Sequence, residues 1–83
     1  MMKLTVYASE SKYEKPEAYD MMAESIEEAQ ALVLTLVDES EPEVFSFIAC
    51  NVYADSGEYL GAISQNGKYW QVGSKYGKEY KPE

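Results

Sequence analysis

Residues 25–42, with the sequence SIEEAQALVLTLVDESEP, contain the best-marked element of the chain, a helix suited to lie across a sheet. Ser25 is a favourable N-cap residue, and Glu28 can reach back to the backbone N–H of the cap, as in a capping box. Pro42 disfavours helical geometry in the residue before it, so the helix is predicted to end in this segment. Apolar side chains recur at helical spacing and give a wide apolar arc, with Ile26, Ala29, Val33, Leu36 and Val37 on one stripe.

Strand patterns flank the helix on both sides. Residues 3–9 alternate apolar and polar side chains, and residues 18–24 again place their larger apolar side chains on one face. This period predicts two strands that pair in antiparallel fashion. Residues 44–53 are apolar on both alternations and rich in β-branched and aromatic side chains, which is typical of a central strand.

An Asn66-Gly67 pair between two short strand patterns is the strongest hairpin signal in the chain. A two-residue turn at this pair would place Ile63 opposite Trp70, on the face that the helix covers. Tyr69 would then point away from Trp70, on the other face of the hairpin.

These elements follow the order ββαβββ. They predict an α+β fold in which a single helix packs on a mostly antiparallel sheet of four to five strands. Eighty-three residues are enough for one domain only. We assign this domain to residues 1–77, and we expect residues 78–83 to fray because they lack apolar periodicity.

The chain carries a net charge of −8 and contains neither histidine nor arginine. Phosphate recognition depends on basic patches and arginine forks, so we expect no direct binding to nucleic acid. The charge is also uneven, because residues 10–58 hold thirteen carboxylates against two lysines, whereas residues 59–83 are mildly basic. The sequence therefore predicts one acidic pole and one weakly basic pole.

Catalytic and metal-binding patterns are lacking in the sequence. Cys50 is the one cysteine, and the chain has no histidine that could lower its pKa or complete a zinc site. Residues 38–43, DESEPE, lack the glycine and the ligand spacing of a calcium loop. We therefore expect a protein that is not an enzyme and that has no catalytic residue, no metal and no cofactor.

The cellular setting follows from the same features. A single cysteine allows no intrachain disulfide and fits a reducing compartment. The first residues are too short an apolar stretch for a signal peptide or a membrane span. We expect a cytoplasmic protein that does not bind membranes, and the sequence leaves its oligomeric state open.

The acidic pole is the most informative functional feature. One interpretation is that the charge serves solubility alone. The other is a surface complementary to a basic groove on a partner protein, since carboxylates can meet the Lys and Arg side chains that normally hold phosphates. Tyrosine is also abundant, with eight residues, and aromatic side chains are frequent interface anchors. The predicted partner-binding residues are Glu27, Glu28, Asp38, Glu39, Glu41, Glu43, Asp55, Glu58 and Tyr69.

The chain is short and acidic and shows no catalytic residues. Its helix starts within AESIEEAQALV at residues 23–33, and its hairpin has the sequence QNGKYW at residues 65–70. In these features it resembles small phage proteins that block bacterial defence, in particular anti-CRISPR proteins. The resemblance covers the architecture and involves no family motif, so no site residues carry over. It implies a stoichiometric inhibitor that binds a Cas effector or another nucleic-acid-handling protein in a bacterial host. Two alternatives stay open, a small-molecule or nucleotide sponge or sensor that acts as an oligomer, and a plain protein-interaction module.

Overall fold

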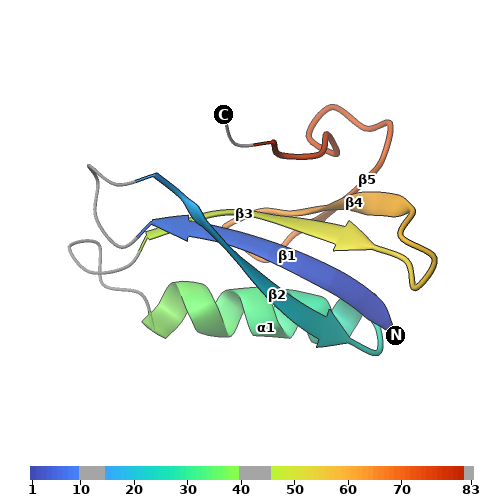
Figure 1. The fold of residues 1–83 in the computed structure, drawn as a ribbon. Helices are drawn as coiled ribbons and strands as arrows, with labels where there is room; N and C mark the ends of the chain where they lie inside the picture. Colours follow the sequence, from blue (N-terminus) through green and yellow to red (C-terminus); the bar gives the residue numbers. More distant parts are fainter. Residues whose placement is uncertain (10–14, 40–45, 82–83) are drawn as a thin grey trace.

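The computed structural model describes residues 1–9, 15–39 and 46–81. Within these residues, five strands form one antiparallel sheet in the order β2-β1-β3-β4-β5, and one helix covers one face of it (Figure 1). The predicted α+β class and the element order are confirmed. The elements are β1 (Met2–Ser9), β2 (Glu17–Ala23), α1 (Ile26–Glu39), β3 (Ser46–Tyr53), β4 (Tyr59–Ile63) and β5 (Tyr69–Gln71).

The hydrophobic core lies between α1 and the adjoining face of the sheet. Leu4 pairs with Val52 and Val6 with Cys50, and residues directly opposite in an antiparallel pair share a face. The alternation predicted for residues 3–9 is therefore confirmed, and residues 46–53 of the predicted central strand lie between β1 and β4. The fully buried apolar side chains of this core are Leu4, Val6, Ala23, Ala29, Val33, Cys50, Val52 and Ile63.

α1 begins with a cap close to the predicted one. The backbone N–H of Glu28 donates to Ser25 Oγ at 3.1 Å, as expected. The Glu28 carboxylate accepts a hydrogen bond from the backbone N–H of Glu24 at 3.4 Å, one residue before the expected donor. The cap satisfies two backbone donors and fixes the point at which the chain leaves β2 and enters the helix. None of the helical structure in the described residues has the length and apolarity that a membrane-spanning helix needs.

The turn between β4 and β5 contains three residues instead of the predicted two. The backbone N–H of Ser64 donates to the Lys68 carbonyl at 3.0 Å, and the N–H of Gly67 donates to the Ser64 carbonyl at 2.8 Å. Gly67 has φ +81°, in the left-handed region that glycine adopts without a steric penalty. This is a turn followed by a left-handed glycine, the usual form of a three-residue hairpin loop.

The longer turn shifts the hairpin register by one residue. Ile63 pairs with Tyr69, and Ala62 pairs with Trp70. Because side chains alternate along a strand, a one-residue shift moves each of them to the other face. Tyr69 therefore packs on the side of the core and Trp70 lies on the opposite face, so the predicted placement of these two rings was wrong.

Residues 72–81 form a second layer, which crosses the sheet on the face opposite α1 (Figure 1). Gly73, with φ +92°, forms the first turn of this segment, in which the N–H of Ser74 donates to the Gln71 carbonyl at 3.1 Å. The sequence predicted that residues 78–83 fray. In the structure, Tyr80 is hydrogen-bonded to β3, and residues 82 and 83 lie outside the described part of the chain.

Candidate functional site

The described members of the predicted acidic set are divided between the two ends of the molecule. Glu27 and Glu28 lie in the first turn of α1, and Asp38 lies in its last turn. With a rise of about 1.5 Å per residue, Glu27 and Asp38 are roughly 16 Å apart along the helix. Asp55 and Glu58 lie in the turn between β3 and β4. The structure therefore does not gather them on one continuous pole.

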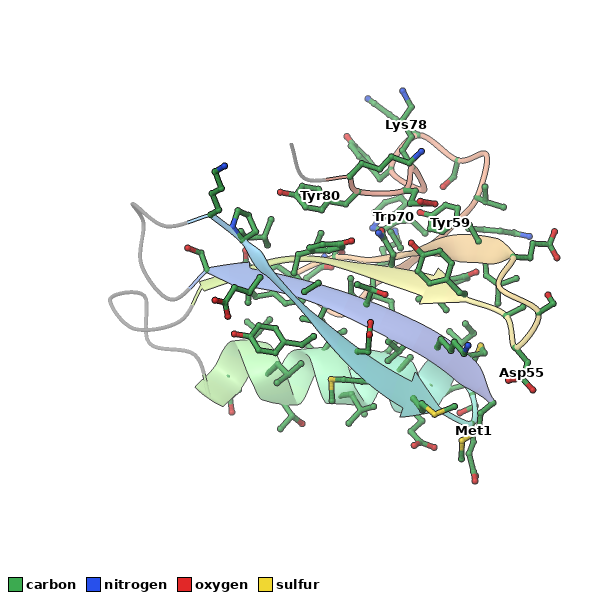
Figure 2. The ribbon with its side chains drawn as sticks, viewed as in Figure 1. Met1, Asp55, Tyr59, Trp70, Lys78 and Tyr80 are labelled. Carbon is green, nitrogen blue, oxygen red and sulfur yellow. The ribbon has the colours of Figure 1, made fainter. Side chains whose placement is uncertain are left out.

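Four of these carboxylates surround the start of β1. Met2 pairs with Ala23, shortly before α1 begins, and Lys3 pairs with Tyr53, shortly before the β3–β4 turn. Figure 2 shows Met1 and Asp55 at this end of the molecule, and the Met1 amino group lies 3.6 Å from the Asp55 carboxylate. We call this region the acidic end. Its carboxylates from the predicted set, all four exposed, belong to Glu27, Glu28, Asp55 and Glu58, and the exposed Glu24 and Lys3 lie in the same region.

The remaining acidic residues of the predicted set are placed only in part. Asp38 is exposed, and Glu39 is the last residue of α1, with a side chain that is not described. Glu41 and Glu43 lie outside the described residues. Among the described residues, Asp55 is the one carboxylate that forms an ion pair, and its partner is the Met1 amino group. The other exposed carboxylates of the acidic end thus have no cationic partner within this part of the chain.

Tyr69 is engaged inside the fold. Its hydroxyl donates to the Leu60 carbonyl at 2.8 Å, and its ring packs close to Gly61, where an added Cβ would lie 2.8 Å from a ring carbon. Burial raises the pKa of the Tyr69 hydroxyl. A role for Tyr69 in partner binding stays a prediction, and the structure gives this side chain an internal contact.

The sheet face opposite α1 carries an aromatic cluster that the sequence analysis missed. Two of its ring pairs join residues 72–81 to the strands, the third joins β3 to β4, and all are tilted or edge-to-face contacts, the geometry that aromatic pairs prefer. The signal in the sequence was the presence of Tyr76 and Tyr80 in a segment that also contains Gly73 and Gly77, because aromatic rings and turn-forming glycines are typical of a folded segment. The ring pairs are Tyr7–Tyr80 with centroids 5.0 Å apart, Tyr53–Tyr59 at 5.8 Å and Trp70–Tyr76 at 4.8 Å.

Asn51 ties the C-terminal segment to the centre of the sheet. Its side chain is fully buried, and its Nδ2 donates to the Tyr80 carbonyl at 2.8 Å while its Oδ1 accepts from the Tyr80 N–H at 2.9 Å. A side-chain amide thus pairs with a backbone as a neighbouring strand would. Tyr59 adds a hydrogen bond from its hydroxyl to the Gly77 carbonyl at 2.9 Å. Burial, together with the negative charge of Glu79, raises the pKa of Tyr59 to about 12.

A cleft of about 660 Å³ opens between this segment and the sheet. Its apolar lining includes Ile48, Ala49, Ala62 and Ile63 from the strands and three rings, those of Trp70, Tyr76 and Tyr80. Figure 2 shows Trp70 and Tyr80 on this side of the sheet, with Lys78 above them. The volume lies in the range of sites that hold small molecules, about 300–1,000 Å³.

A β-bulge turns Ile48 toward the cleft. Tyr7 pairs with Ala49, whereas Ala8 pairs with Phe47, so Ile48 is the extra residue on β3. Phe47 packs against the core on the helix side. Bulges redirect side chains, and Ile48 is 39% exposed and borders the cleft. The bulge thereby supplies apolar surface on a face where strict alternation would not place it.

Lysine side chains surround the aromatic wall. The Nζ atom of Lys68 lies 4.3 Å from the centre of the Trp70 ring, and that of Lys75 lies 5.3 Å from the centre of the Tyr76 ring. Lys78 borders the cleft directly. The aromatic faces stabilise Lys68 and Lys75, and with Lys78 these lysines place positive charge around a cleft that the carboxylate of Glu79 also borders.

Cys50 is fully buried, and burial raises the pKa of its thiol to about 12. Across residues 1–9, 15–39 and 46–81, no three His, Cys, Asp or Glu side chains come together as a group that could hold a metal ion. In comparisons with protein-family models, curated proteins and solved structures, nothing matches the chain.

Proposed function

We propose that this protein is a non-catalytic binding protein that docks its acidic surface on a cationic surface of another protein. The observation that carries the proposal is the acidic end, where exposed carboxylates lie on the first turn of α1 and on the β3–β4 turn, and where Asp55 alone has an ion-pair partner among the described residues. Such carboxylates can form charge-assisted hydrogen bonds with Lys and Arg side chains of a partner.

The class of partner follows from the same chemistry. Protein surfaces rich in Lys and Arg are those that hold nucleic-acid phosphates, so an acidic ligand would compete with nucleic acid for them. We propose a nucleic-acid-handling protein as the target, such as a Cas effector in the bacterial cytoplasm, in line with the resemblance to phage inhibitors. Occupancy of the surface would be sufficient for inhibition.

A displacement assay with matched double variants tests this proposal. Proteins of a bacterial lysate are bound to immobilised DNA and eluted with the purified protein at low salt. Glu27→Gln/Glu58→Gln neutralises two carboxylates of the acidic end and leaves the helix cap at Glu28 in place. Glu17→Gln/Asp20→Asn removes the same charge from β2 and serves as the control.

We expect the wild type and the control to elute the same DNA-binding protein, and the acidic-end variant to need a concentration about tenfold higher. Elution by the wild type should be lost in about 0.5 M salt, because exposed charges are screened. Equal elution by both double variants would show that the acidic end is a solubility feature, and no elution by the wild type would remove the proposed target class.

A further inference from the structure

We propose that the cleft between residues 72–81 and the sheet binds a nucleotide, that is, a planar base that carries an anionic phosphate. This inference goes beyond the proposed function, because the cleft lies on the sheet face opposite α1 and none of the acidic-end residues borders it. It depends on three features of the cleft, namely its rigid aromatic wall, its polar rim and its surrounding cations.

The aromatic wall is held in place before any ligand arrives. The Nε1 atom of Trp70 donates to Ser64 Oγ at 3.2 Å, and Tyr76 packs edge-on against the same ring. Tyr80 is fixed by its backbone pair with Asn51 and by its ring contact with Tyr7. Side chains fixed in this way lose little conformational entropy on binding, and aromatic faces stack with bases of any sequence.

The rim of the cleft offers polar groups suited to the edge of a base. Gln65 and Asn66 border the cleft in the β4–β5 turn. Asn66 is held in the turn, where its Oδ1 accepts from the Lys68 N–H at 3.1 Å and from the Ser64 hydroxyl. Gln65 is exposed, and its amide can both donate and accept hydrogen bonds. The rim thus matches the mixed donors and acceptors of a nucleobase.

The lysine side chains around the cleft favour a ligand with an anionic group. Lys78 borders the cleft, and Lys68 and Lys75 lie over two of its rings. Glu79 also borders the cleft. Its negative charge helps to raise the pKa of Tyr53 in β3 and of Tyr59 in β4. The ammonium group of Lys78 is therefore the group that we assign to the phosphate, because lysine binds phosphate as a compact point charge.

Fluorescence of Trp70 provides a direct assay, because this residue is the only tryptophan of the chain. The protein is titrated with AMP and GMP, and separately with adenosine, guanosine and inorganic phosphate. We expect saturable quenching by at least one nucleotide, about tenfold weaker binding of its nucleoside and no quenching by phosphate. Lys78→Gln should weaken nucleotide binding about tenfold and leave adenosine binding unchanged.

Two variants complete the design. Tyr76→Leu should weaken binding of AMP and of adenosine alike, since it removes an aromatic wall. Lys81→Gln, a lysine of the same segment that does not border the cleft, should change neither. The proposal is overturned if neither nucleotide quenches saturably up to about 10 mM, if the nucleoside binds as well as the nucleotide that quenches, or if Lys78→Gln and Lys81→Gln have equal effects. Because both lysine positions are exposed, these outcomes do not depend on a variant that fails to fold.

Discussion

Asn51→Val removes both hydrogen bonds that hold Tyr80 to the sheet and keeps a side chain of similar size at a fully buried position. A hydrogen bond contributes about 1 kcal/mol net, so the two together contribute about 2 kcal/mol. The freed N–H and carbonyl of Tyr80 can reach water if residues 78–81 lift from the sheet. We therefore expect the substitution to favour local opening of this segment over global unfolding.

Amide hydrogen exchange measured by NMR checks this prediction at the Tyr80 N–H. A loss of about 2 kcal/mol corresponds to a roughly 30-fold decrease in protection, since each ~1.4 kcal/mol is a factor of ten. Tyr80→Phe is the matched control, because it keeps the backbone pair with Asn51 and the ring contact with Tyr7. If Asn51→Val left the protection at residue 80 within threefold of the wild-type value, the amide pair would not be what holds the segment.

Three further predictions concern the turns, the buried thiol and the tyrosine hydroxyls. Gly57→Ala and Gly67→Ala both place alanine at a positive φ, which costs about 1–2 kcal/mol, but only at Gly67 would the new Cβ meet the Leu34 side chain, at 2.7 Å. Urea denaturation should therefore show a free energy of unfolding about 1 kcal/mol lower for Gly67→Ala than for Gly57→Ala, and equal values would exclude the contact with Leu34. Cys50 should react with a thiol reagent at pH 8 roughly 100-fold more slowly in the native protein than in denaturant, because the thiol is buried and its pKa is raised to about 12; equal rates would show that β3 opens readily. The pKa of Tyr59 lies at about 12 in the fold against an ordinary value of 10.0, so its contribution to stability is complete below pH 10 and is lost as the pH rises through 12. Tyr59→Phe should consequently lose less stability than the wild type between pH 9 and pH 12 in urea titrations, and parallel losses would contradict the raised pKa.

Local signals were sufficient to predict the main elements. The Ser25 cap and the apolar stripe of α1 depend on residues within a few positions of each other, and the structure contains both. The alternation of residues 3–9 likewise predicted the buried face of β1. Period and capping describe short-range geometry, so they predict an element without knowledge of its neighbours.

The hairpin register follows from the length of the turn, which the Asn66-Gly67 pair does not determine. Gly67 is held by α1, where Gln30 Nε2 donates to the Gly67 carbonyl at 3.0 Å and Leu34 packs over the glycine. These partners are more than thirty residues away in sequence. The turn at residues 54–58 has the same hydrogen-bond pattern, with its glycine at φ +94° and no Asn-Gly pair. The glycine in its left-handed conformation determines the loop length, and the preceding residue does not.

The cleft could not be predicted, because its walls come together through long-range contacts. Asn51 and Tyr80 are 29 residues apart, and nothing near Asn51 in the sequence marks it as the anchor of a distant segment. The acidic residues were recognisable by type. Their division between two ends follows from the direction of α1, which carries Asp38 away from Glu27.

Part of the charge of the described residues is separated across the sheet. Lys75 and Lys78 belong to the layer above the sheet, and Glu27, Glu28 and Asp38 belong to the helix below it. These three carboxylates of α1 lie on the side away from Lys75 and Lys78, so we expect a positively charged support to bind the helix side more readily than the layer of residues 72–81. The layer that carries Lys75 and Lys78 would then face outward and stay accessible. The immobilised molecules would share a preferred orientation, which their own charge determines.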